Sequence, residues 1–232
     1  MEYWMKQYKL RCYGDSFTRY TGPKELEWPD RLGYHLGIPV ENRGRSSISN
    51  LSIGLNVLVD YRQGLIDSNT IVLYMTTAIE RLPLIVTDPY NQSGFSSTSA
   101  ELNSGYRHFA SWMKENLELV HPRVQDGYTA HGLRLVNRIQ RQTQCQLFYI
   151  VGWKDIDKLL YPETTQLLGT HSALIRQSGS TLDSLATEIT GSDETLGRSD
   201  SEYYIPQDGH WQPKMHELVA LHLRDPIRRS IR

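Results

Sequence analysis

Two short and almost unbroken apolar runs constrain the fold of this 232-residue chain more than any other feature. They occupy residues 71–75 and 145–151. Such runs are typical of strands that are buried in a parallel sheet. Near the N-terminus, residues 8–13 alternate polar and apolar side chains, which predicts another strand. A shorter strand is expected over residues 38–42.

Segments with helical character separate these strands. The first begins near Pro29 and ends at Gly37, which suit the first turn and the C-terminal cap of a helix. Alternation of strands and helices implies a parallel sheet that is covered on both faces. We therefore expect an α/β fold in a single domain over residues 1–232. Helices are expected over residues 28–37, 47–64, 100–119 and 131–143, and from Pro213 onward.

Charge and hydropathy exclude several classes of partner. The net charge is −1, so no overall field favours nucleic acid or an anionic membrane. The basic residues at positions 224–232 are interpreted as a solvated C-terminus. No run of 18 apolar residues predicts a transmembrane helix, and residues 1–6 do not resemble a signal peptide. We expect a cytoplasmic protein, and one that is associated with a virion is the alternative.

The cysteines and histidines predict neither a disulfide nor a metal site. Cys12 and Cys145 both fall in predicted strands, where buried free thiols are expected. The histidines lack the spacing of metal ligands, and His216 is interpreted as a structural or exposed helix residue. No cofactor is predicted.

The first predicted strand ends in a short turn over residues 13–18. Gly14 permits a sharp turn, and Ser16 would then stand at its tip near the start of a helix. Backbone N–H groups and the helix dipole favour negative charge there, which suits a nucleophile whose attack creates an oxyanion. The alternative is an ordinary turn in which Asp15 and Ser16 act as capping residues.

A second polar segment, near the C-terminus, supports the interpretation of Ser16 as a nucleophile. Asp208 and His210 lie in a loop just before the last helix. An imidazole presented there could take the proton of Ser16, while a carboxylate holds its tautomer. In parallel sheets the active crevice lies at the carboxyl ends of the strands. Both segments are expected at that edge.

Three motifs together resemble the GDSL, or SGNH, hydrolase family. They are Gly14-Asp15-Ser16, Asn42-x-Gly44 and Asp208-x-His210, and they follow the family's order over nearly the whole chain. The resemblance implies a flavodoxin-like three-layer α/β/α sandwich with a five-stranded parallel sheet. It also implies ester hydrolysis through an acyl-serine. Ser16 is then the nucleophile, His210 the base and Asp208 its partner, with the N–H groups of Ser16 and Gly44 as the oxyanion hole.

The chain departs from that pattern in three places. The family's Gly-x-Asn-Asp block is replaced after the third strand, where Thr76 or Thr77 could supply a hydroxyl to the oxyanion instead. Asp208 and His210 are two residues apart instead of three, and the Asp-x-His-Trp sequence is similar to the alginate O-acetyltransferase-like branch. Phe17 stands where the family has leucine.

The substrate is predicted from the loops around this site. Residues 88–99 are small, polar and turn-rich, and are expected to form a loop or lid. Tyr90, Phe95 and Trp211 could stack on a sugar, or pack within the protein. We expect an esterase for a small acyl ester, such as acetyl on a carbohydrate. The alternatives are a non-catalytic structural or glycan-binding module, for instance in a viral or surface assembly, and an O-acyltransferase.

Overall fold

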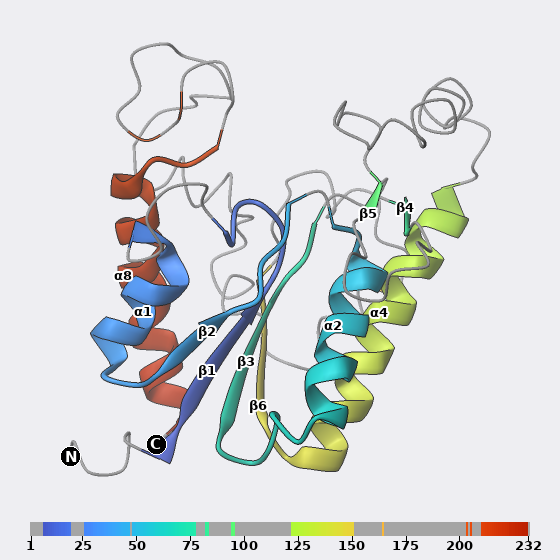
Figure 1. The fold of residues 1–232 in the computed structure, drawn as a ribbon, viewed down its shortest axis with the longest axis horizontal. Coiled ribbons are helices and arrows are strands. Elements are labelled where there is room, and N and C mark those ends of the chain that lie inside the picture. The colour runs from blue at the N-terminus through green and yellow to red at the C-terminus, as the bar shows by residue number, and fades with distance from the viewer. Residues whose placement is uncertain are drawn as a thin grey trace.

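The computed structural model shows a parallel sheet with helices on both faces (Figure 1). The structure describes residues 7–19, 26–46, 48–77, 82–83, 94–95, 122–150, 164, 203, 205 and 210–231. For residues 82–83, 94–95 and 122–125 it describes only the backbone.

Four strands of the described chain form the main sheet, in the order β2-β1-β3-β6. All neighbouring pairs are parallel, and Cys12 of β1 lies opposite Asn42 of β2 and Leu73 of β3. Both apolar runs of the sequence are strands of this sheet, as predicted. The strands are β1 (Lys9–Tyr13), β2 (Val40–Asn42), β3 (Thr70–Met75) and β6 (Gln146–Ile150).

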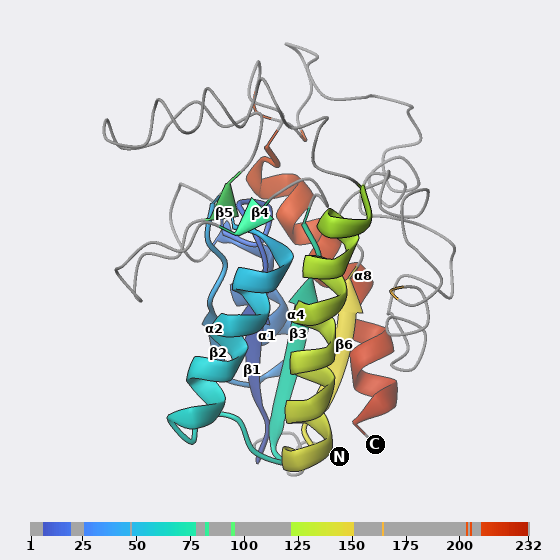
Figure 2. The same cartoon turned by 90° about the vertical axis from the view of Figure 1, so that its right-hand side faces the viewer.

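The helices cover the sheet in two pairs. Helices α1 (Trp28–Leu36) and α8 (Pro213–Ser230) pack together on one face, and α2 (Asn50–Arg62) and α4 (Pro122–Thr143) on the other (Figures 1 and 2). This is the predicted three-layer arrangement. A separate antiparallel pair, β4 (Leu82–Pro83) and β5 (Gly94–Phe95), completes the described strands.

The side chains of the strands alternate between two apolar cores. From β1, Leu10 and Cys12 face the core under α1 and α8, whereas Tyr13 faces the core under α2 and α4. Leu73 and Tyr74 of β3 divide in the same way. Burial on both faces explains why the third strand is almost purely apolar.

Helices α2 and α4 approach each other through two glycines. A Cβ atom on Gly54 would lie 2.8 Å from the carbonyl oxygen of Gly132, and one on Gly132 would lie 2.6 Å from that of Asn50. The backbones are therefore in direct contact at this crossing. Small residues are what permits it.

Most helix ends follow the predicted signals. Helix α1 has proline in its first turn and ends at Gly37, whose φ of 69° suits glycine. Helix α2 begins after Ser49, whose side chain accepts the Ser52 N–H. Helix α4 begins at residue 122, nine residues before the predicted start. The early part of this helix contains Gly127, a residue that is more typical of loops than of helix interiors.

The fifth strand that the family resemblance implies is not found in the main sheet of the described residues. Residues 203 and 205 do not extend the main sheet but pair with the segment before α8, through hydrogen bonds from Ile205 N–H to His210 O and from Gln212 N–H to Tyr203 O, both 2.7 Å long. The described sheet therefore has four strands instead of five. Most of the predicted 88–99 loop and the whole 100–119 helix lie outside the described residues.

Both cysteines are buried free thiols, as predicted. Burial raises the pKa of the Cys12 thiol well above its usual range. Among the helices of the described chain, none combines the length and apolar character needed to cross a membrane.

Candidate active site

The turn after β1 is held by the side chain of Asp15. This carboxylate is fully buried, and it accepts the Phe17 N–H at 3.0 Å and the Thr77 hydroxyl at 2.8 Å. The Asp15 carbonyl accepts the N–H groups of Thr18 and Arg19. Asp15 thus acts as the capping residue of the turn and ties it to the end of β3, while Ser16 remains half-buried at the tip.

Glycine is required in this turn because of space. A Cβ atom on Gly14 would lie 2.0 Å from Thr18 Oγ1 and 2.9 Å from Met75 Cβ, and one on Gly44 would lie 2.9 Å from Thr18 Cβ. Gly14 does not have a positive φ, so the backbone freedom expected from the sequence is not the reason. The Thr18 side chain fills the space between the two glycines and is fully buried.

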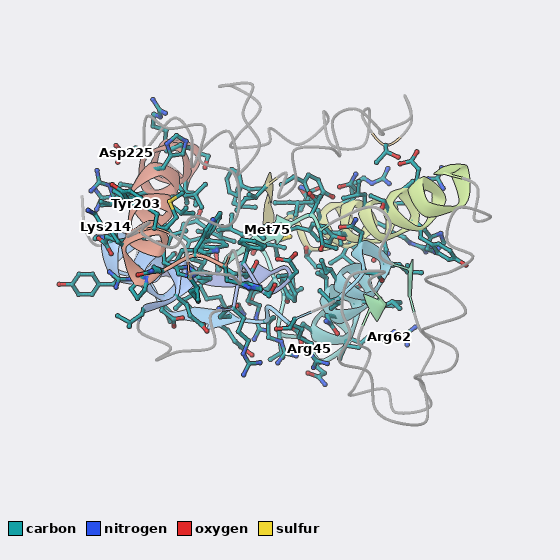
Figure 3. All side chains as sticks on the ribbon, turned by 90° about the horizontal axis from the view of Figure 1, so that it is seen from above. Arg45, Arg62, Met75, Tyr203, Lys214 and Asp225 are labelled. Carbon is teal, nitrogen blue, oxygen red and sulfur yellow. The ribbon has the colours of Figure 1, made fainter. Side chains whose placement is uncertain are left out.

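The predicted contact between Ser16 and His210 is present. His210 Nε2 lies 2.7 Å from Ser16 Oγ, and both side chains are partly buried. The two residues come from opposite ends of the chain and meet at the carboxyl-end edge of the sheet. Figure 3 views this edge from above, with α1 and α8 on one side of Met75 and α2 and α4 on the other.

An aromatic side chain packs against the imidazole of His210. The Phe17 ring stacks on it with centroids 5.0 Å apart and an interplanar angle of 25°. Phe17 also meets Trp211 edge-on at 5.2 Å. The two backbone hydrogen bonds with residues 203 and 205 hold this segment, and Lys214 Nζ lies 5.0 Å from the centre of the Tyr203 ring (Figure 3).

His216 links this segment to α1 and is structural, as predicted. Its Nδ1 accepts the Trp28 N–H at 3.2 Å, and the Trp28 indole N–H donates to the Phe17 carbonyl at 3.0 Å. Burial lowers the pKa of His216 to about 3, and the electrostatic influence of Arg31 and His210 acts in the same direction. His216 is therefore neutral at physiological pH and can accept this bond. Helices α1 and α8 together connect the nucleophile turn with the His210 segment.

Asn42 fixes the loop after β2 against the same turn. Its amide nitrogen donates to the Thr18 carbonyl at 2.7 Å and to Glu27 Oε2 at 2.6 Å, while its oxygen accepts the Gly44 N–H at 2.9 Å. The sequence marked Asn42 only as part of a motif. The Asn-x-Gly pattern is typical of an asparagine that bonds the backbone two residues on, and this signal could have found the contact with Gly44.

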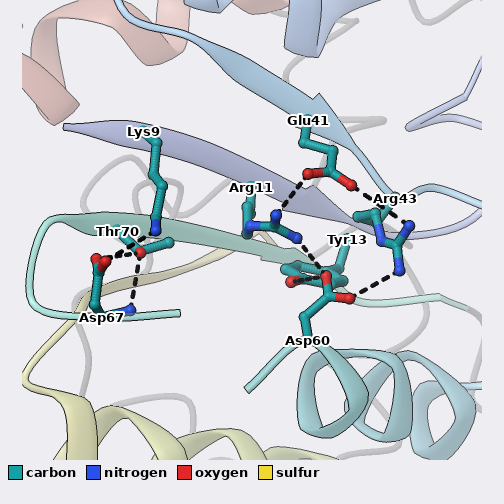
Figure 4. A network of polar contacts seen from close by, with 8 residues as sticks. All are labelled: Lys9, Arg11, Tyr13, Glu41, Arg43, Asp60, Asp67 and Thr70. Atoms are coloured by element: carbon teal, nitrogen blue, oxygen red, sulfur yellow. Dashed lines mark hydrogen bonds and ion pairs between the residues drawn. The ribbon is translucent and has the colours of Figure 1, made fainter. Parts of the chain in front are cut away.

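A network of charges lies under the same loop (Figure 4). Asp60 is fully buried and accepts hydrogen bonds from Arg11, Tyr13 and Arg43 at 2.6, 2.6 and 2.8 Å. Glu41 pairs with Arg11 at 2.6 Å. Burial raises the pKa of the Tyr13 hydroxyl, and the negative charge of Asp60 adds to the effect. The network joins β1, β2 and α2 next to the site.

The two threonines after β3 are engaged elsewhere. The Thr77 hydroxyl donates to Asp15, and the Thr76 hydroxyl lies 3.4 Å from the Ile150 carbonyl. Both residues are fully buried. Asn50 from α2 holds this segment by accepting the Thr77 N–H at 2.9 Å and donating to the Thr77 carbonyl at 2.9 Å. The Thr77 hydroxyl is therefore committed to the Asp15 carboxylate.

The structure does not bring the remaining predicted site residues together with Ser16 and His210 among the described side chains. Trp211 is 1% exposed and packs in the core under α1 and α8, so its alternative role in packing is the one observed. Phe95 belongs to β5, and only its backbone is described. Asp208 and Tyr90 lie outside the described residues. Within the part of the chain that is described, His, Cys, Asp and Glu side chains nowhere gather in threes as metal ligands would.

Comparison with known proteins places the fold. No protein-family model matches the sequence, and no curated protein matches it. The structure is similar to a lipolytic protein of the G-D-S-L family from Veillonella parvula DSM 2008, with a TM-score of 0.52 and 12% identity over 95% of this chain and 98% of that one. The structure is also similar to the psychrotrophic esterase EstA from Pseudoalteromonas sp., with a TM-score of 0.51 and 12% identity over 96% of this chain and 98% of that one.

A third similar structure belongs to a longer protein. The acetyl xylan esterase Est2A from the rumen bacterium Butyrivibrio proteoclasticus gives a TM-score of 0.52 and 10% identity. It is matched over 97% of this chain but only 65% of its own, so the present chain spans less than two thirds of it. The chain therefore has the α/β fold that this lipolytic protein and these two esterases share.

Proposed function

We propose that this protein is a serine esterase of the SGNH type that hydrolyses a small acyl ester through an acyl-serine. The observation that carries the proposal is the 2.7 Å contact between Ser16 Oγ and His210 Nε2. This distance lies within the reach that a general base needs to take the proton of a nucleophile. The similar fold of a G-D-S-L lipolytic protein and of two esterases supports the same conclusion.

The reaction has two halves. In the first, Ser16 Oγ attacks the ester carbonyl carbon while its proton passes to His210 Nε2, and the carbonyl electron pair moves to the oxygen. The intermediate collapses, and the leaving alcohol takes the proton from Nε2. In the second half, a water molecule replaces the alcohol and releases the acid. Asp208 is proposed to hold the other ring nitrogen of His210.

The oxyanion is proposed to bind backbone N–H groups. No described residue accepts a hydrogen bond from the Ser16 N–H. The Gly44 N–H donates to Asn42 Oδ1, and it serves the oxyanion when this bond is shared or released. Neither Thr76 nor Thr77 is the preferred third donor, because both hydroxyls face other oxygens. A lost donor typically reduces the rate about 100- to 1000-fold, so a modest turnover is expected.

The proposed substrate is an acetyl ester on a carbohydrate. One of the similar structures is an acetyl xylan esterase, and the sequence places aromatic and polar residues in the loop over 88–99. A sugar hydroxyl could replace water in the second half of the reaction, as the Asp-x-His-Trp resemblance to an O-acetyltransferase-like branch implies. The same residues would then act, and only the acceptor would differ.

A second candidate is a non-catalytic module with the same fold. The engaged hydroxyls of Thr76 and Thr77 favour it, because the asparagine donor of the family pattern has no evident replacement among the described residues. The contact between Ser16 and His210 opposes it. Activity measurements separate the two candidates.

The test is hydrolysis of p-nitrophenyl acetate and of a panel of acetylated sugars by the wild type and by Ser16→Ala. The matched control is Ser68→Ala, because Ser68 is exposed in the turn that precedes β3, at the opposite edge of the sheet. Loss of activity in Ser16→Ala alone would establish the serine esterase. Equal background rates in all three proteins, on every ester, would instead support the non-catalytic module. Adding an acceptor sugar to the active enzyme would distinguish transfer from hydrolysis.

A further inference from the structure

Phe17 is the residue directly after the proposed nucleophile, and its ring faces the proposed base. The centroids of Phe17 and His210 are 5.0 Å apart with an interplanar angle of 25°. This is a stacked arrangement within the range of favourable aromatic pairs. One residue of the turn thus supplies the reacting hydroxyl, and the next covers a face of the imidazole that receives its proton.

The backbone of Phe17 is fixed on both sides. Its N–H donates to Asp15 Oδ1 at 3.0 Å, and its carbonyl accepts the Trp28 indole N–H at 3.0 Å. Asp15 is fully buried and Trp28 is 1% exposed, so both anchors are parts of the packed interior. The Phe17 ring also makes an edge contact with Trp211, with centroids 5.2 Å apart, and Trp211 is likewise buried. The ring is therefore part of a rigid support.

We propose that Phe17 is a positioning residue that holds the His210 imidazole with Nε2 toward Ser16 and stabilises the ring when it becomes an imidazolium. The inference rests on the proposed esterase function. The stack restricts rotation of the imidazole about its bond to Cβ, and such a rotation would carry Nε2 away from Ser16 Oγ. The SGNH family that the chain resembles has leucine at this position, and a leucine side chain has no flat face to stack on an imidazole.

The electrostatics of the cluster agree with this role. When His210 takes the proton of Ser16, positive charge develops on a ring that lies against an aromatic face, and this contact is attractive. The other histidine of the cluster, His216, stays neutral because burial, with help from Arg31 and His210, lowers its pKa to about 3. No second imidazolium therefore opposes the charge on His210.

The test compares Phe17→Leu and Phe17→Met with Phe17→Tyr. Leucine and methionine keep an apolar side chain without a ring face, whereas tyrosine keeps the ring face and adds one hydroxyl at a residue that is partly exposed. The matched control is Tyr8→Leu. Tyr8 is a partly buried aromatic residue that packs against the core under α1 and α8. It precedes β1, whereas Ser16 and His210 lie beyond the other end of that strand.

Two readouts are measured for each protein. The first is the rate at which a fluorophosphonate probe labels Ser16, followed by intact mass, and the second is kcat and KM for p-nitrophenyl acetate. We expect Phe17→Leu and Phe17→Met to lower the labelling rate and kcat roughly 3- to 10-fold, the effect of one lost aromatic stack, with little change in KM. Phe17→Tyr and Tyr8→Leu should remain within about 2-fold of the wild type. Thermal unfolding checks that each variant is folded.

The outcomes separate this inference from the proposed function. Labelling of Ser16 at the wild-type rate in Phe17→Leu and Phe17→Met would overturn the positioning role and leave the esterase intact. An equal loss in Phe17→Tyr would also overturn it, because the ring face would then not be what matters. A wild type that is never labelled at Ser16 would overturn the esterase proposal and this inference with it.

Discussion

His210 Nε2 lies 2.7 Å from Ser16 Oγ, although 194 positions separate the two residues in the sequence. The connection between them runs through α1. Trp28 donates its indole N–H to Phe17, next to Ser16, and its backbone N–H to His216 of α8, the helix that follows His210. The distance between Ser16 and His210 therefore depends on how α1 and α8 pack against each other.

Replacement of His210 by alanine tests the base directly. We expect the kcat for p-nitrophenyl acetate to fall at least about 100-fold, because positioned acid–base groups contribute about 100- to 10,000-fold. The missing ring leaves a space beside Ser16, so added imidazole should restore part of the rate. Activity is measured with and without 100 mM imidazole. The control is His131→Ala, since His131 is exposed on α4 on the other face of the sheet. Full activity in His210→Ala would contradict the mechanism.

Gly14→Ala should disturb the nucleophile turn. The new Cβ atom would lie 2.0 Å from Thr18 Oγ1 and 2.9 Å from Met75 Cβ, so side chain and backbone must both shift. Overpacking of this kind destabilises by about 1–3 kcal/mol. Urea unfolding measures the loss. Gly127→Ala is the control, because it lies in α4 with nothing within 4 Å of the new atom. It should stabilise by about 0.4–1 kcal/mol.

Much of the scaffold could be predicted because its signals are local. Apolar runs identified β3 and β6, and proline and glycine identified the ends of α1. The contact between Ser16 and His210 followed from motif order together with the rule that parallel strands place their carboxyl ends at one edge. Each of these inferences uses residues that are close in the sequence, the order of motifs in a family that the chain resembles, or a general property of parallel sheets.

The parts that could not be predicted depend on distant partners. Asn42 reaches Glu27, and Trp28 reaches His216 across 188 positions, and one sequence does not reveal such pairs. The role of Gly14 shows the same limit. Glycine was expected for its backbone freedom, but the structure requires it because Thr18 packs against it. The residue was correctly selected, and the physical reason lay in a contact that only the folded turn forms.

Asp60→Ala should strongly destabilise the protein. Asp60 accepts three hydrogen bonds, and its removal leaves the Arg11 guanidinium, whose side chain is 7% exposed, without its main buried partner. Breaking a buried ion pair from one side typically costs about 3–5 kcal/mol. The exposed pair of Lys9 and Asp67 in Figure 4 provides the control. Lys9→Ala should cost less than about 1 kcal/mol in the same urea titration, and equal losses would refute this account.

His216 makes the stability depend on pH in a defined direction. Its pKa in the folded protein is about 3, because of burial and the electrostatic influence of Arg31 and His210, against an ordinary value of 6.5. Above pH 6.5 the residue is neutral in both states and the contact with Trp28 contributes in full. As the pH falls below 6.5, only the unfolded chain takes up the proton, so the free energy of unfolding decreases until about pH 3.

The variant that tests this is His216→Gln, which retains an oxygen that can accept the Trp28 N–H but does not titrate. At pH 5 the proton uptake by the unfolded chain costs the wild type about 2 kcal/mol relative to pH 7. The variant lacks this contribution, while every other titrating group is common to both proteins. Urea unfolding at pH 7 and pH 5 should therefore show a decline that is about 2 kcal/mol smaller in His216→Gln. An identical decline in the two proteins would mean that His216 is not buried as a neutral ring.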